Sequence, residues 1–142
     1  MSRLALLLLL SLLPSCVWTR SGWASRGSYR VLYESPSVQI RRGGQKIDPH
    51  TGELLIAWVG ARAPEGQPSL VACELTVFVD RDGDAAPGTG EILLRRECLE
   101  RAGKVLFGDV RVRETGGKLL RARMVASTGR ERCVVTWRVA PD

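Results

Sequence analysis

Residues 70–98, LVACELTVFVDRDGDAAPGTGEILLRREC, decide the fold, because two apolar segments flank an acidic, glycine-rich turn. Valine, leucine, isoleucine and phenylalanine supply most of the apolar residues of the two segments, and Asp-Gly between such segments is a strong hairpin signal. We take Asp80 to lie opposite Glu91 at the turn. With this register Cys73 lies directly opposite Cys98. The stretch therefore predicts an antiparallel hairpin.

The second half of this stretch can also be read as a helix. Over residues 91–102 most apolar side chains would share one helical face, and Gly103 would suit a C-terminal cap. Leu93 and Arg95 would then lie on the wrong faces. We predict the strand and keep a helix over 91–102 as the alternative.

The chain around the hairpin alternates between apolar and polar residues with period two, which is typical of half-buried strands. Its 142 residues suit one domain. We therefore predict an all-β fold, a two-layer antiparallel β-sandwich that is broadly immunoglobulin-like, over residues 29–140. The core candidate Trp58 precedes the downstream cysteines, so the Cys…Trp…Cys signature of true immunoglobulin domains is absent. Besides the hairpin, strands are expected at 29–34, 37–42, 54–61, 105–114, 119–127 and 133–139.

The N-terminal segment has the features of an export signal. One arginine precedes a leucine-rich run over 4–13, too short to span a bilayer and of the length of a signal-peptide core. The run ends in LPSC at 13–16, which resembles the lipobox of bacterial lipoprotein precursors. That resemblance implies a lipid on Cys16, a membrane anchor and a location in the cell envelope. Residues 17–28 are predicted to form a flexible tether, and the alternative is a secreted or periplasmic protein that is cleaved further on.

The turn of the hairpin is also a candidate calcium loop. Three aspartates at every second position are followed by a glutamate at the twelfth position, and calcium takes six to eight oxygen ligands. The loop resembles an EF-hand loop and the DxDxD loops of exported bacterial proteins, with Ala85 where the EF-hand has glycine. A solvated Asp-Gly turn is the alternative. The ligands implied by this resemblance are Asp80, Asp82, Asp84, the carbonyl of Ala86, and Glu91.

Three cysteines remain in the predicted domain. Export to an oxidising compartment favours a disulfide, and the hairpin register favours Cys73–Cys98, which leaves Cys133 as a third thiol. A Cys98–Cys133 or Cys73–Cys133 bond stays open, because spacing alone does not define connectivity. The absence of a CxxC pair and the single histidine, His50, argue against a zinc site.

Positive charge is concentrated in the second half of the chain. The net charge is +6, and residues 95–138 contain twelve Lys or Arg but only five Asp or Glu. Residues two apart on a strand share a face, so Arg-x-Arg pairs predict one arginine-rich face, on which Arg113 would lie opposite Arg121 and Arg111 opposite Arg123. A bound anion would offset the repulsion between them. The predicted anion-binding residues are Arg111, Arg113, Arg121, Arg123 and Arg132, and a solvated arginine-rich surface is the alternative.

These features predict a non-enzymatic cell-envelope protein, a small binding or assembly module for an anionic envelope component or an acidic protein. A calcium-stabilised adhesion or matrix module is the second possibility. An envelope hydrolase is the third, disfavoured because the sequence has neither GxSxG nor HExxH. Export and the lack of aromatic residues between the arginines argue against a nucleic-acid partner.

Overall fold

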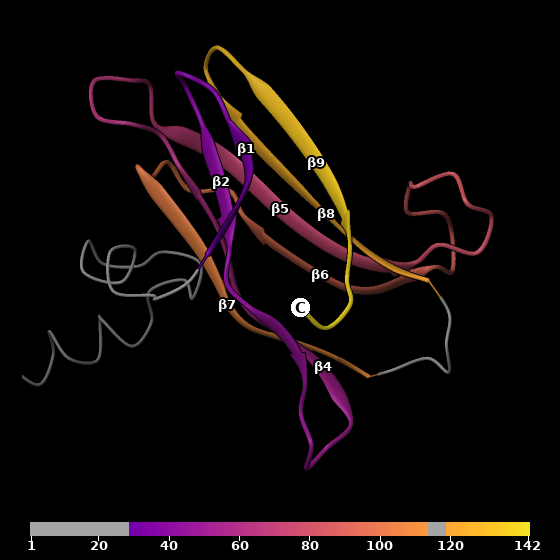
Figure 1. Cartoon of the computed structure of the whole chain (residues 1–142). Coiled ribbons are helices and arrows are strands. Elements are labelled where there is room, and N and C mark those ends of the chain that lie inside the picture. The colour runs from indigo at the N-terminus through magenta and orange to yellow at the C-terminus, as the bar shows by residue number, and fades with distance from the viewer. Residues whose placement is uncertain (1–28, 114–118) are drawn as a thin grey trace, which may run out of the picture.

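The computed structural model describes residues 29–113 and 119–142, which form two antiparallel sheets (Figure 1). This part of the chain contains strands and no helix, so it offers no helix long and apolar enough to cross a bilayer. The leader over 1–16, the lipid on Cys16, the tether over 17–28 and the turn at 114–118 lie outside the described residues. The strands are β1 (Arg30–Glu34), β2 (Gln39–Arg42), β3 (Gln45–Ile47), β4 (Glu53–Arg62), β5 (Leu70–Val79), β6 (Ile92–Cys98), β7 (Lys104–Arg113), β8 (Leu120–Thr128) and β9 (Arg132–Arg138).

The first sheet is centred on β4, the strand that forms most of its pairs. β7 pairs along one edge of β4, while β2 and β3 follow each other along the opposite edge and β1 pairs with β2. β2 and β3 thus act as one strand, interrupted at Gly43 and Gly44. The second sheet has the order β6-β5-β8-β9.

The predicted two-layer antiparallel sandwich is confirmed, and its central pairs follow the immunoglobulin order. β4 pairs with β7 as strand B pairs with E, and β5, β8 and β9 are neighbours as C, F and G are. β6 takes the position of strand C′ of variable domains. The two sheets share one apolar core, to which β8 contributes alternate residues Leu120, Ala122, Met124 and Ala126.

Residues 70–98 form the predicted antiparallel hairpin of β5 and β6, and the alternative of a helix over 91–102 is wrong. Cys73 lies opposite Cys98 as expected. Near the turn, however, a bulge places Phe78 opposite Ile92, whereas the uniform register predicted Val79 opposite Ile92. Bulges are common at sheet edges, and β6 is an edge strand.

The expected pairing of the strands on either side of the 114–118 turn is wrong. β7 joins the first sheet through β4, and β8 joins the second sheet between β5 and β9. Arg113 therefore does not lie opposite Arg121, and Arg111 does not lie opposite Arg123. The chain passes from one layer to the other between β7 and β8. Each of these strands gains a long pairing there, β7 with β4 and β8 with β5.

Trp58 is buried but stands apart from the main core, contrary to our expectation. The core residues of β4 are Leu54 and Ile56, then Val59 and Ala61, so the strand exchanges its faces in between. Trp58 consequently packs with Leu106 in a separate small cluster.

Candidate anion-binding pocket and acidic loop

The outer face of the second sheet carries a row of polar side chains that crosses its strands. Thr76 of β5 lies between Arg95 of β6 and Arg123 of β8, and Thr136 of β9 follows in the same row. Adjacent strands are about 4.8 Å apart, so Arg95 and Arg123 leave the sheet about 10 Å from each other. Arg132 lies on the same face at the start of β9, opposite Ser127.

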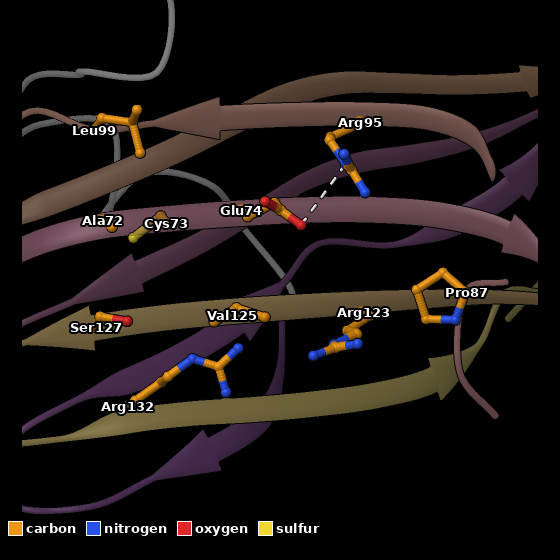
Figure 2. Close-up of a pocket in the computed structure, with 10 residues that line it drawn as sticks. All are labelled: Ala72, Cys73, Glu74, Pro87, Arg95, Leu99, Arg123, Val125, Ser127 and Arg132. Atoms are coloured by element: carbon orange, nitrogen blue, oxygen red, sulfur yellow. Dashed lines mark ion pairs between the residues drawn. The ribbon is translucent and has the colours of Figure 1, made fainter. Parts of the chain in front are cut away.

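A concave pocket of about 380 Å³ lies among these side chains (Figure 2). Its floor is formed by β5 and β8, and Pro87 of the acidic loop contributes to one wall. The 80–91 loop therefore reaches over this face of the sheet, which agrees with the complete burial of Phe78, an outer-face residue. The pocket is lined by Ala72, Cys73, Glu74, Pro87, Arg95, Leu99, Arg123, Val125, Ser127 and Arg132.

The charge of this pocket is unbalanced. Arg95, Arg123 and Arg132 face one carboxylate, Glu74, whose Oε1 lies 3.7 Å from Nε of Arg95. Nε of Arg123 is buried and forms no hydrogen bond with the described residues. Arg123 and Arg132 form no ion pair with the described residues, so an anionic oxygen that enters the pocket would be favoured by their charge.

The predicted arginine-rich face is divided between the two sheets. Arg111 lies on the first sheet, where Nη1 is 3.0 Å from Oδ2 of Asp48 and Nε is 3.2 Å from Oδ1 of Asp109. The hydrogen bond with Asp48, followed by that with Asp109, raises the pKa of Arg111. Arg113 lies on the same strand, opposite Glu53. Of the five predicted residues, only Arg123 and Arg132 line the pocket.

Arg121 connects the arginines of the second sheet to the acidic loop. Its Nε donates a 2.8 Å hydrogen bond to Oδ2 of Asp80, whose side chain is fully buried. The N–H groups of Gly83 and Ala85 donate to the same carboxylate at 3.0 and 3.1 Å. Burial alone would raise the pKa of Asp80, but Arg121 and these two N–H groups together lower it. Asp80 is therefore held as a carboxylate at the base of the loop.

The structure brings the three aspartates of the loop together. One carboxylate oxygen from each of Asp80, Asp82 and Asp84 lies within 4.8 Å of the others. A hydrogen bond with Asp84 is the main cause that raises the pKa of Asp82. Ala85 has φ of 58°, so it adopts the left-handed turn for which an EF-hand uses glycine. The N–H of Ala86, the residue expected to offer a carbonyl, donates to Asp84.

The side chain of Glu91, which its spacing predicts to be a metal ligand, instead binds the backbone of the loop. Its Oε2 accepts the N–H of Arg81 and its Oε1 accepts the N–H of Gly88, both at 2.8 Å. It thus closes the loop by binding its backbone, and Glu91 could become a metal ligand only by giving up these hydrogen bonds.

The three described cysteines are thiols, and no disulfide joins them, so the predicted Cys73–Cys98 bond is not formed. Cys98, Cys73, Ala126 and Cys133 form one row across the buried face of the second sheet. Cys133 is separated from Cys73 by a whole strand, about 10 Å, which is too far for a disulfide. Cys73 and Cys98 are adjacent but pack as small apolar groups in a core that is large enough to be stable without a covalent link.

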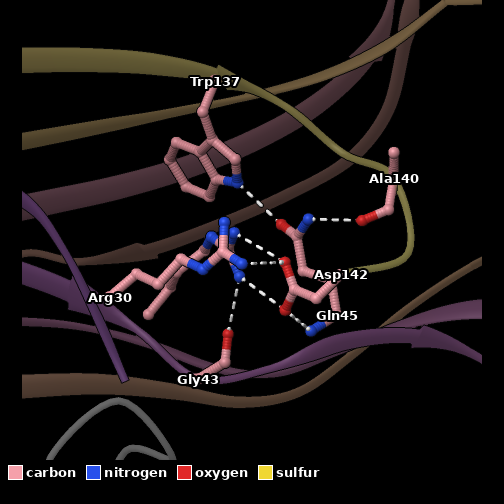
Figure 3. A network of polar contacts seen from close by, with 7 residues as sticks. Arg30, Gly43, Gln45, Trp137, Ala140 and Asp142 are labelled. Carbon is pink, nitrogen blue, oxygen red and sulfur yellow. Dashed lines mark hydrogen bonds and ion pairs between the residues drawn. The ribbon is translucent and has the colours of Figure 1, made fainter. Parts of the chain in front are cut away.

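Two polar networks outside the pocket had no signal in the sequence, and Figure 3 shows the one around Asp142. Asp142 accepts hydrogen bonds from both terminal nitrogens of the buried Arg42 and from the N–H of Gln45. Glu131 accepts hydrogen bonds from the hydroxyls of Tyr33 and Ser35, at 2.5 and 2.9 Å. The first network joins the first sheet to the residues after β9, and the second joins it to the turn between β8 and β9.

Two pocket residues were missed as well. Glu74 and Arg95 belong to strands that were predicted, but no Arg-x-Arg pair marks them. Their period-two position on the outer face of the hairpin could have identified them, because Thr76 lies opposite Arg95 in the predicted register. His50, the single histidine, lies exposed in the turn between β3 and β4, where its N–H donates to Asp48.

The pairings define an immunoglobulin-like β-sandwich with an arginine-lined pocket on one outer face. No family model, no curated protein and no solved structure matches the chain.

Proposed function

We propose that this chain is a non-enzymatic cell-envelope binding module that holds an anionic group of its partner in the pocket of the second sheet. The observation that carries this proposal is the gathering of Arg95, Arg123 and Arg132 around a single carboxylate, Glu74. Guanidinium groups bind carboxylate and phosphate through paired, charge-assisted hydrogen bonds. The apolar part of the pocket, Val125 and its neighbours, would contact the uncharged part of the same ligand.

The location in the envelope is proposed from the leader alone. A lipid on Cys16 and a short tether would hold the sandwich close to the membrane, where anionic head groups, polysaccharides and acidic proteins are abundant. Mass spectrometry of the mature N-terminus tests this part. We expect an acylated Cys16, and a soluble form that starts downstream of Cys16 would contradict it.

Retention on an immobilised sulfated polysaccharide tests the pocket. The variant with Arg123→Ser and Arg132→Ser should elute at lower salt than the wild type, because both arginines line the pocket. The matched control with Arg101→Ser and Arg138→Ser removes the same charge from exposed positions outside the lining. Equal elution of the two double variants would show that retention depends on overall charge, and the pocket proposal would then be abandoned.

A calcium-stabilised adhesion or matrix module is the second candidate, favoured by the proximity of Asp80, Asp82 and Asp84. Ion binding would relieve the repulsion between these carboxylates. At about 100 times its dissociation constant, calcium would add about 2.7 kcal/mol to the free energy of unfolding. For a domain of this size that raises the melting temperature by several degrees.

Thermal unfolding in calcium and in excess chelator distinguishes this candidate. We expect a calcium-specific rise that is lost when Asp82 and Asp84 are both changed to Asn. Equal melting temperatures in calcium and in chelator would identify the loop as an Asp-Gly turn closed by Glu91.

A further inference from the structure

The edge strand β6 and Leu99, the residue that follows it, concentrate exposed apolar side chains. Ile92, Leu93 and Leu99 are 38%, 43% and 69% exposed, and they are three of the seven exposed large apolar residues in the described chain. β6 pairs only with β5 within its sheet, so the backbone groups of its other edge have no strand partner among the described residues. An apolar open edge of this kind is a template for pairing with another strand.

The charged residues of β6 are unbalanced in a single copy of the chain. Glu97 lies directly opposite Glu74 of β5, a like-charge pair that is destabilising. Arg95 lies 3.7 Å from Glu74, whereas Glu97 forms no ion pair with the described residues. The outer side of this edge therefore presents a carboxylate that a cation from a second strand would stabilise.

We propose that two copies of this chain pair antiparallel through β6, with the two-fold axis at Arg96. In this register Arg95 of each copy lies opposite Glu97 of the other copy. Leu93 likewise lies opposite Leu99 of the other copy. The exposed side chains of the edge then form two ion pairs and two apolar pairs.

Neighbouring registers are not complementary. An axis at Arg95 would bring the two copies of Arg95 together and place Leu93 opposite Glu97. An axis at Glu97 would bring two carboxylates together and place Arg95 opposite Leu99. On the outer face only the axis at Arg96 brings opposite charges together, and it places the two copies of Arg96 opposite each other on the inner face.

Arg96 itself must be accommodated, since a charged side chain that points inward on an edge strand usually discourages pairing. Here Nη1 of Arg96 donates a 2.7 Å hydrogen bond to the carbonyl of Gly108 on β7. Its guanidinium is thus already anchored on the first sheet of its own copy, and pairing at β6 does not require a new partner for it.

The resulting dimer would have a continuous sheet of order β9-β8-β5-β6 followed by β6-β5-β8-β9. Antiparallel pairing keeps the outer faces on one side, so the pockets of the two copies lie on one surface. Two pockets on a single surface would bind a repeating anionic ligand more tightly than either pocket alone.

Sedimentation of the full chain in a mild non-ionic detergent, over a concentration series, tests the dimer. We expect the wild type to dimerise, and Arg95→Glu or Glu97→Arg to raise the dimer dissociation constant at least about tenfold, because each variant replaces two attractive pairs by two repulsive ones. The combined Arg95→Glu and Glu97→Arg variant restores both pairs and should dimerise as the wild type does. Arg138→Glu, the same change of charge on the opposite edge strand of the sheet, is the control and should have no effect.

A wild-type chain that stays monomeric across the series overturns the proposal. It is equally overturned if both single variants dimerise like the wild type, or if the combined variant remains monomeric although its thermal unfolding shows that it is folded.

Discussion

Arg42 and Asp142 illustrate how a buried charge is stabilised in this sandwich. The side chain of Arg42 is only 6% exposed, and both its terminal nitrogens donate to the carboxylate of Asp142. This pair, above all the hydrogen bonds from Arg42, lowers the pKa of Asp142 from 3.8 to about 2. A carboxyl group with a lowered pKa stabilises the folded state while it is ionised, so its contribution is complete above about pH 4 and is lost as the pH falls towards 2.

Asp142→Asn is therefore expected to reduce the free energy of unfolding at neutral pH by about 1–3 kcal/mol, since the variant leaves a buried guanidinium without its anion. The loss should shrink as the pH is lowered from 4 to 2, because the wild type then loses the same ion pair. Urea denaturation at several pH values measures both effects. A difference between wild type and variant that does not change with pH would contradict this role of the ion pair.

For the acidic loop, the sequence predicted which aspartates lie close together better than it predicted what each carboxylate binds. Asp80, Asp82 and Asp84 were expected to meet, and they do. Glu91 was expected at the same site but binds backbone N–H groups. The spacing of acidic residues predicts which of them share a loop, whereas the direction of each side chain depends on the backbone of the folded loop.

Among the elements, the interrupted strand formed by β2 and β3 depends on two glycines with different surroundings. A Cβ at Gly43 would lie 2.5 Å from Nε1 of Trp58, whose ring is buried, whereas a Cβ at Gly44 would have its nearest neighbour at 3.8 Å. The first approach is possible only for glycine, and it allows β2 to pass close to Trp58.

Gly43→Ala should consequently lower the free energy of unfolding by about 1–3 kcal/mol, the usual cost of overpacking. Gly44→Ala is the matched control, and it should change stability little. Chemical denaturation of both variants makes the comparison, and equal stability of the two would exclude the close approach of Gly43 to Trp58.

Period-two alternation predicted most strands because a half-buried strand requires it, whatever its neighbours are. It could not predict β3, which has only three residues, because so short a segment has no recognisable period. Nor could it assign β7 and β8 to different sheets, since alternation distinguishes inner from outer residues but not one layer from the other. For that reason we predicted one arginine-rich face, whereas the arginines of β7 and β8 lie on two different sheets.

For the molecule as a whole, the three described thiols belong to the apolar core that the two sheets share. Cys73, Cys98 and Cys133 are all buried, and burial is the main cause that raises the pKa of the Cys133 thiol. A thiol with a raised pKa forms little of the reactive thiolate, so the folded protein should react slowly with alkylating reagents.

Intact-mass measurement after alkylation tests this account. Without reductant, the folded protein should gain few labels at these positions, and the denatured protein should gain one at each of Cys73, Cys98 and Cys133. Reduction before denaturation is the control and should add no further label. Two labels fewer in the unreduced sample would reveal a disulfide.

The contacts of Asp142 and Glu131 also have a consequence for how the chain folds. Arg42 and Asp142 are 100 positions apart, and Tyr33 and Glu131 are 98 positions apart. Contacts between such distant positions require the closure of long loops before they return any free energy, and folds rich in them form in milliseconds to seconds. If a chain crosses a membrane N-terminus first, Arg42 and Tyr33 can make these contacts only after Asp142 and Glu131 have followed.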